Sequence, residues 1–157
     1  MRDNITFGQG DTSDAALLAA CEASGAAEML PGFRSGLNTL LTSEWFGGQQ
    51  LSGGQWQRLV LTRAFHRQAA LLVMDEPTAA LDARVEHRIF AGLRELAKDR
   101  AILLITHRLT NVAVADRIVV LDEGRIVQEG TYAQLTEQPG LFRTLWELQH
   151  RMSGDTA

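Results

Sequence analysis

Residues 71–77 read Leu-Leu-Val-Met-Asp-Glu-Pro, a short apolar run that ends in two carboxylates. Strands buried in a parallel sheet are near-continuous apolar runs, so Leu71–Asp75 predicts such a strand. Ala101–Thr106 is a second run of this kind. Between them, the sequence from Asp82 to about Asp99 has apolar residues at helical spacing. Strands that alternate with helices predict an α/β fold.

The flanking sequence predicts further helices and one hairpin. Glu123-Gly124 is a two-residue turn signal between two predicted strands, Arg117–Asp122 and Arg125–Glu129. Residues 1–10 have no apolar period, so a loop or a strand remnant is expected there. Residues 32–50 are rich in glycine and predict a loop with a short strand at most. The predicted helices are Asp14–Ala23, about Gly25–Leu30, about Ser52–Gln68, Tyr132–Glu137 and Leu141–Arg151.

Composition excludes several classes of protein. The chain has 157 residues, of which 45% are hydrophobic and 22% charged, an ordinary globular composition. It is neither disordered nor collagen-like, and its one cysteine, Cys21, cannot form a disulfide within the chain. No apolar run approaches the roughly 18 residues of a membrane-spanning helix. The net charge of −4 and the scattered basic residues argue against a nucleic-acid partner.

The segment Leu51-Ser52-Gly53-Gly54-Gln55 predicts an anion site at a helix start. Ser52 and Gln55 have the spacing of a capping box, which alone would indicate only a capped helix. Two glycines in a first helical turn each cost about 1 kcal/mol relative to alanine, and a plain cap does not need them. Glycine allows close approach to a backbone whose free N–H groups attract anions, so a phosphate is the expected ligand.

Polar residues that follow the two predicted strands are candidates for chemistry. Asp75 and Glu76 end the first strand, and neighbouring side chains of an extended chain point to opposite sides. One of them can therefore reach a metal ion while the other addresses a water. His107 follows the second strand at the same sheet edge, where it can donate to a phosphate oxygen. Asp82, taken alone, predicts a helix N-cap.

Together these motifs resemble the ATP-binding cassette (ABC) ATPases in order and spacing. Leu51–Gln55 matches the signature sequence of that family, and Leu71–Asp75 with Glu76 resembles its Walker B strand and catalytic glutamate. Ala80–Asp82 resembles the D-loop, and His107 the switch histidine. Resemblance to exporter-type cassettes in particular is carried by Arg2–Gly8, Glu129–Thr131 and Leu141–Gln149.

The resemblance implies an ATP site shared between two cassettes that dimerise head to tail. Ser52, Gly53 and Gly54 would touch the γ-phosphate of ATP held by the partner cassette. Gln55 would belong to the same nucleotide-binding segment, and Asp82 would lie at the dimer seam.

The resemblance also implies roles for the residues that follow the strands. Asp75 would hold Mg²⁺ through water, Glu76 would polarise the attacking water, and His107 would contact the γ-phosphate. Glu76 and His107 are thus the expected catalytic residues, and Asp75 the expected metal ligand.

One motif of the family is missing from the 157 residues. A P-loop requires Gly-x-x-x-x-Gly-Lys-Ser/Thr. Gly48 and Gly53 have its glycine spacing, but Gly54 stands where lysine is required, and Lys98, the only lysine, lies in a predicted helix. The segment Ser43–Gly48 also differs in composition from the corresponding loop of many exporters. We therefore expect a partial cassette that lacks the P-loop half.

The expected architecture is a partial P-loop NTPase-like α/β core preceded by a helical subdomain. Residues 1–68 would form that helical (signature) subdomain, and residues 69–157 the C-terminal part of the ATPase core. ATP and Mg²⁺ would bind only with a P-loop supplied by a missing segment or by a partner. The isolated chain is accordingly expected to be inactive.

The expected function is part of the nucleotide-binding domain of an ABC exporter, which couples ATP hydrolysis to export. Its partners would be a second nucleotide-binding domain and the exporter's transmembrane domains, on the cytoplasmic side of the plasma membrane. Two alternatives remain open: a fragment of a soluble, non-transport ABC ATPase, and a non-catalytic remnant that binds a partner.

Overall fold

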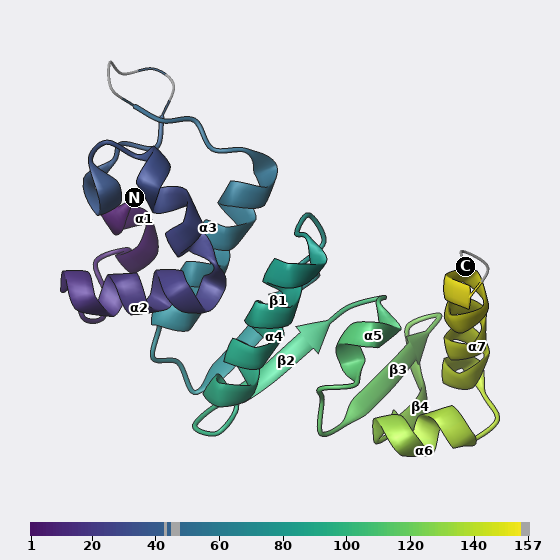
Figure 1. Cartoon of the computed structure of the whole chain (residues 1–157). Coiled ribbons are helices and arrows are strands. Elements are labelled where there is room, and N and C mark those ends of the chain that lie inside the picture. The colour runs from purple at the N-terminus through teal and green to yellow at the C-terminus, as the bar shows by residue number, and fades with distance from the viewer. Residues whose placement is uncertain (43, 45–47, 155–157) are drawn as a thin grey trace. The chain divides into compact units, whose positions relative to one another are not determined.

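The computed structural model describes residues 1–42, 44 and 48–154 (Figure 1). The Ser43–Gly48 segment lies mostly outside the described residues. The chain divides into two compact units, Met1–Ile105 and Thr106–Ala157. The predicted boundary between residues 68 and 69 falls inside the first unit, and it stays a prediction about subdomains. No helix in the described part of the chain is long and apolar enough to cross a membrane.

The first unit begins with helices. They are α1 (Arg2–Thr6), α2 (Asp14–Ser24), two 3₁₀ helices η1 (Ala26–Gly32) and η2 (Gly36–Asn38), and α3 (Gly53–His66). The predictions of α2 and α3 are confirmed to within two residues at each end. The predicted helix at 25–30 is a 3₁₀ helix that runs to Gly32, with Pro31 inside it.

The expectation of a loop or strand remnant at residues 1–10 is wrong for its first half, because α1 forms there. Five residues are too few to show an apolar period, so long-range contacts decide the conformation. Ile5 is buried in the core of the helical region. Arg63 of α3 donates to the backbone carbonyl of Asn4 and, at 3.1 Å, to its side-chain oxygen.

The two apolar runs form a parallel pair, β1 (Leu71–Asp75) and β2 (Ala101–Ile105), with Leu71 opposite Ala101 and Asp75 opposite Ile105. Helix α4 (Ala83–Leu96) connects them. The parallel pairing and the helical connection confirm the predicted βαβ order.

The prediction that both strands are buried is wrong for one face of the sheet. Alternate residues on that face are exposed, because the described helices do not fully cover it. These exposed apolar residues are Leu71, Val73, Leu103 and Ile105.

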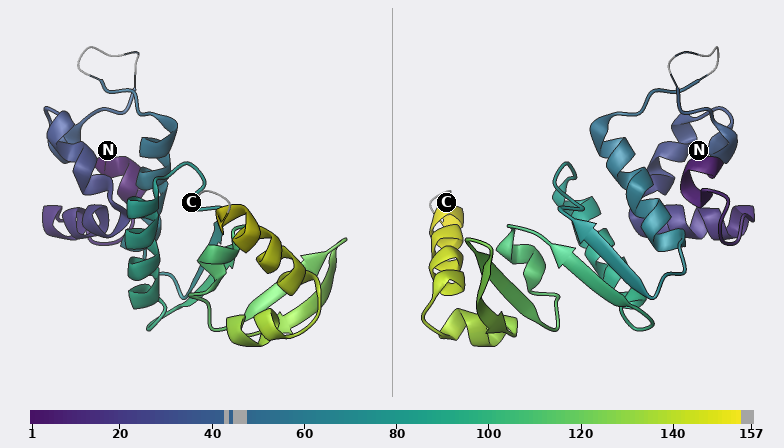
Figure 2. Two further views of the ribbon diagram at one scale, coloured as in Figure 1. Left: turned by 45° about the vertical axis from the view of Figure 1, so that its right-hand side comes forward. Right: turned by 180° about the vertical axis from the view of Figure 1, so that it is seen from behind.

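The second unit contains the predicted hairpin, β3 (Ile118–Asp122) and β4 (Arg125–Gly130). Its turn residues Glu123 and Gly124 both have positive φ, at 45° and 75°, as a two-residue hairpin turn with right-handed strand twist requires. The short helix α5 (Leu109–Val112) precedes the hairpin, and α6 (Tyr132–Glu137) and α7 (Leu141–Gly154) follow it (Figure 2).

A small core of Ile118, Leu135 and Phe142 joins these elements of the second unit. Tyr132 packs edge-on against Phe142, and its hydroxyl accepts a 2.8 Å hydrogen bond from the Trp146 indole.

Candidate functional site

The start of α3 is the predicted capping box. The Ser52 hydroxyl accepts from the backbone N–H of Gln55 at 3.3 Å, and the Gln55 side-chain oxygen accepts from the Ser52 N–H at 2.9 Å. The first N–H groups of a helix have no acceptor within the helix. The box satisfies one of them, at Gln55, and leaves those of Gly53 and Gly54 directed off the helix end. These donors and the helix dipole make the site attractive to an anion.

The two signature glycines have different surroundings. A Cβ atom added at Gly53 would meet nothing within 4 Å. A Cβ added at Gly54 would lie 3.2 Å from the backbone carbonyl of Ala80. Packing within the chain therefore explains a small residue at Gly54 but not at Gly53, where the open surface leaves room for an external group.

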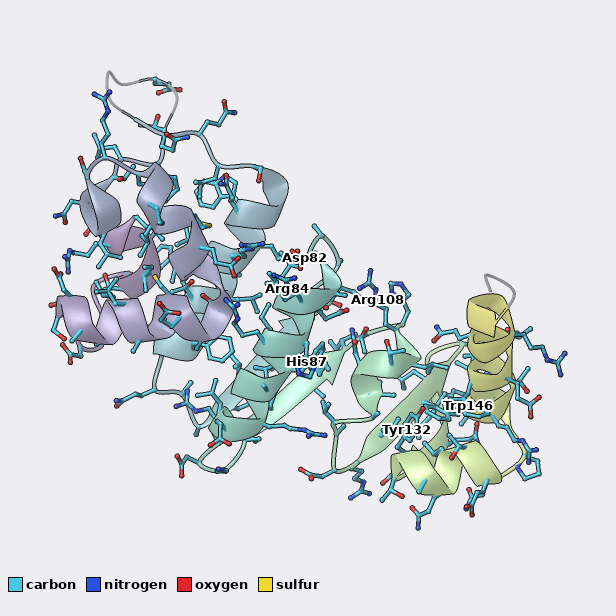
Figure 3. The ribbon with its side chains drawn as sticks, viewed as in Figure 1. Asp82, Arg84, His87, Arg108, Tyr132 and Trp146 are labelled. Carbon is cyan, nitrogen blue, oxygen red and sulfur yellow. The ribbon has the colours of Figure 1, made fainter. Side chains whose placement is uncertain are left out.

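Asp82 caps the next helix, α4, and Figure 3 labels it at the first turn of that helix. Its carboxylate accepts from the N–H groups of Arg84 and Val85, both at 3.1 Å. The Val85 N–H bond is the main reason that the pKa of Asp82 lies below its ordinary value, with smaller contributions from the Arg84 N–H and the Arg58 charge. Asp82 is thus held as an exposed anion at neutral pH.

The α3 start and the segment before α4 face a common pocket of about 250 Å³. Its one cationic side chain is Arg58, whose guanidinium pairs with Glu28 at 3.0 Å and with Asp82 at 3.4 Å. Four of the five residues predicted to bind nucleotide therefore share one pocket. The residues that line it are Glu28, Met29, Ser52, Gly54, Gln55, Arg58, Ala80, Leu81 and Asp82.

The two predicted carboxylates lie at the end of β1. The Asp75 side chain is exposed, as a metal ligand facing solvent would be. Glu76 lies in the left-handed region at φ 44°, a conformation that costs a non-glycine residue about 1 kcal/mol. Its N–H donates to the Ile105 carbonyl at 2.9 Å, which continues the β1–β2 pairing beyond Asp75. Backbone strain of this kind is often found at functional sites.

A second hollow of about 270 Å³ runs along α3 and β1. Val60 and Val73 expose apolar surface there, and Asp75 and Pro77 also line it. The exposed Asp75 carboxylate therefore borders this hollow.

Mg²⁺ prefers near-octahedral oxygen ligands and is commonly bound through one or two carboxylates, water and substrate phosphates. Among the described residues, no three His, Cys, Asp or Glu side chains gather into a metal cluster. Asp75, a single exposed carboxylate, fits the protein's share of a site in which phosphates and water supply the other ligands.

His107 belongs to the second unit, two residues after the end of β2. Its backbone carbonyl accepts from the Gln149 side chain of α7 at 3.5 Å, and its own side chain is exposed.

Sequence reasoning missed two side chains that join these segments. The Gln57 amide donates to the Glu76 carbonyl at 3.1 Å and accepts from the Ala80 N–H at 3.0 Å. Arg58 pairs with Asp82, as described above. Both stand just after the signature, but no local pattern indicates contacts that reach 19 to 24 residues along the chain.

Comparisons with known proteins agree with these motifs. The ABC transporter family profile matches residues 21–79. The ATP-dependent lipid A-core flippase of Chromobacterium violaceum is 41% identical over 93% of this chain and 24% of that protein. The β-(1→2)glucan export ATP-binding/permease protein of Agrobacterium fabrum is 39% identical over 92% and 24%. A bacterial Atm1-family ABC exporter with ATP bound superposes with a TM-score of 0.82 and 33% identity, over 94% of this chain and 25% of that one.

Over almost its whole length the chain is similar to part of the ATP-binding region of ABC transporters, among them exporters. The predicted resemblance and the predicted partial P-loop NTPase α/β fold are thereby confirmed. The chain spans about a quarter of the length of the curated relatives that it matches. ABC ATPases as a family use ATP and Mg²⁺, and the relatives are transporters.

Proposed function

We propose that this chain is the C-terminal part of the nucleotide-binding domain of an ABC exporter, which couples ATP binding and hydrolysis to transmembrane export. The observation that carries the proposal is the pocket shared by Ser52, Gly54, Gln55 and Asp82. A capped helix start, whose first N–H groups have no acceptor within the helix, and an open glycine surface are suited to a terminal phosphate. The exporter names of the relatives favour this function over a soluble ABC ATPase or a non-catalytic remnant.

On this proposal the signature residues bind ATP that a second nucleotide-binding domain holds. Ser52, Gly53 and Gly54 approach its γ-phosphate, and the open surface beside Gly53 supports that role. Gln55 fixes the helix start through the capping box. Asp82, an exposed anion on the rim of the same pocket, lies at the seam of the head-to-tail dimer.

The residues after β1 and β2 serve hydrolysis. Mg²⁺, when bound through Asp75, neutralises phosphate charge. Glu76 orients the attacking water and accepts its proton, and His107 donates a hydrogen bond to the γ-phosphate. The exposed Asp75 carboxylate and the strained Glu76 backbone support the roles of metal ligand for Asp75 and general base for Glu76.

The phosphate cradle must come from a P-loop outside these residues. The 157 residues contain no Gly-x-x-x-x-Gly-Lys-Ser/Thr segment, so a further segment or a partner supplies the lysine and the nested N–H groups. The isolated chain is then inactive. In the assembled exporter it lies on the cytoplasmic side of the membrane, joined to transmembrane domains.

The test is Glu76→Gln in a full-length protein that carries this chain. Loss of a general base lowers turnover by about 10²- to 10⁴-fold, while equilibrium binding of ATP stays intact. Glu123→Gln is the matched control, because Glu123 is also a glutamate with φ near 45° but lies in the hairpin turn. Near-parental ATP hydrolysis by Glu76→Gln would refute the assignment.

A further inference from the structure

We propose that Gln57 is a positioning residue that fixes the catalytic Glu76 turn to the signature helix. The proposal rests on the function proposed above for Glu76 and for the α3 start. One side-chain amide bridges two backbone groups of the same turn: its nitrogen donates to the Glu76 carbonyl at 3.1 Å, and its oxygen accepts from the Ala80 N–H at 3.0 Å.

The chemistry of the bridge requires a carboxamide of this length. If the Gln57 amide were flipped, its NH₂ group would face the Ala80 N–H, and two donors would meet. The partners therefore fix which side-chain atom is the oxygen and which is the nitrogen. A carboxylate has no donor, so its oxygen would face the Glu76 carbonyl oxygen and two acceptors would repel each other. An apolar side chain of equal length would make neither bond.

The bridged turn also has hydrogen bonds of its own. The Glu76 carbonyl accepts from the Ala79 N–H at 3.3 Å, and the Leu81 N–H donates to the Thr78 carbonyl at 3.1 Å. Glu76 also adopts the costly left-handed conformation. A bond from the α3 helix to each end of the turn adds a restraint that ties this segment to the signature helix.

The bridge also connects the two halves of the candidate site. Gln57 lies about one helical turn after Gly54, where an added Cβ would lie 3.2 Å from the Ala80 carbonyl. A displacement of the signature helix would therefore move the backbone of Glu76 through the amide. Gln57 itself does not line the pocket at the signature, so it acts on hydrolysis through the position of Glu76.

The first arm of the test measures the bridge without reference to activity. Amide hydrogen exchange is followed in the 157-residue chain and in Gln57→Met, with Gln68→Met as the control for an exposed glutamine. Losing one hydrogen bond should speed exchange at Ala80 by about tenfold, while exchange at Trp56 within α3 is unchanged. Unchanged exchange at Ala80 in Gln57→Met overturns the proposal.

The second arm measures hydrolysis in a full-length protein that carries the chain. Gln57→Met should lower kcat by about tenfold or more with KM for ATP within about twofold, because the base is misplaced while binding is spared. The proposal is overturned if Gln57→Met and Gln68→Met lower kcat equally, or if only KM changes.

Gln57→Glu separates the bridge from general packing. At neutral pH this variant keeps an acceptor for Ala80 but loses the donor to Glu76, so kcat should fall. Protonation of the new carboxyl restores a donor, so kcat relative to the parent should recover as pH falls; a ratio independent of pH overturns the bridge. If Glu76→Gln keeps parental activity, the proposed function fails, whereas full loss in Glu76→Gln with no loss in Gln57→Met refutes this inference alone.

Discussion

Helices α1 to α3 bury their apolar residues in a shared core, whereas one face of the β1–β2 sheet leaves its apolar residues exposed. In the helical region Ile5, Leu17 and Leu59 are at most 1% exposed and share one core. On one face of the sheet Val73 is 54% exposed and Leu103 is 51% exposed. Several helices can pack their apolar faces against one another around a shared core, whereas a two-stranded sheet needs a further layer packed on each face to bury it.

The same contrast divides the candidate site. Ser52 and Gly54 of the packed helices line a pocket together with Asp82 of the segment before α4. Asp75 and Glu76 stand at the end of a strand on which Leu71 and Val73 are 56% and 54% exposed. The signature side is therefore self-supporting, whereas the hydrolytic side needs further structure before it can hold a triphosphate.

The largest expected effect is the failure of the 157-residue chain to bind nucleotide. Two carboxylates at a strand end repel phosphate, and the sequence contains no P-loop motif whose lysine and N–H groups would offset them. Calorimetry with Mg·ATP should detect no binding tighter than about 1 mM. A full-length protein that carries the chain should bind ATP under the same conditions. Micromolar affinity that persists on dilution of the isolated chain to monomer would contradict this view of the hydrolytic side.

The next effect compares the two regions directly by core truncation. Leu59→Ala removes a fully buried side chain from the helical core and should lower the free energy of unfolding by about 3 kcal/mol. Leu103→Ala is the matched variant on the open sheet face and should cost less than about 1 kcal/mol. Urea denaturation of both variants measures the difference. Equal losses would mean that the sheet face is covered in solution, for example by a second copy of the chain.

Short-range patterns sufficed to predict most elements of the fold. The apolar runs of β1 and β2, the Glu123-Gly124 turn and the Ser52 cap each depend on neighbours within a few residues. Their predictions succeeded because the local preference and the final structure agree. Burial of the two strands was overestimated, because an apolar run shows what a strand would bury but not whether anything covers it.

Features set by long-range contacts could not be predicted. Helix α1 is stabilised by Arg63, 59 residues away, and not by any period of its own. The Gln57 bridge likewise joins segments 19 and 23 residues apart. For the candidate site, sequence reasoning named the residues at the pocket and at the strand end. It did not identify Gln57 and Arg58, which hold the signature helix to the segment after β1.

The smallest effect concerns the two signature glycines, which only the structure distinguishes. Gly53→Ala adds a Cβ where nothing lies within 4 Å, so better helix propensity should raise the free energy of unfolding by about 0.5 kcal/mol. Gly54→Ala gains the same propensity but places its Cβ 3.2 Å from the Ala80 carbonyl, so it should be less stable than Gly53→Ala by about 1 kcal/mol.

In a full-length protein, Gly53→Ala should have the opposite effect on dimerisation to its effect on stability. Gly53→Ala should then reduce ATP-dependent dimerisation although it stabilises the fold, because its Cβ occupies the surface that the phosphate approaches. Thermal unfolding of the chain and chromatography of the full-length protein measure the two effects separately. Equal stabilities for the two alanine variants would show that the Ala80 backbone moves to make room for the added methyl group. The α3 start would then be less firmly packed than the core of the helical region.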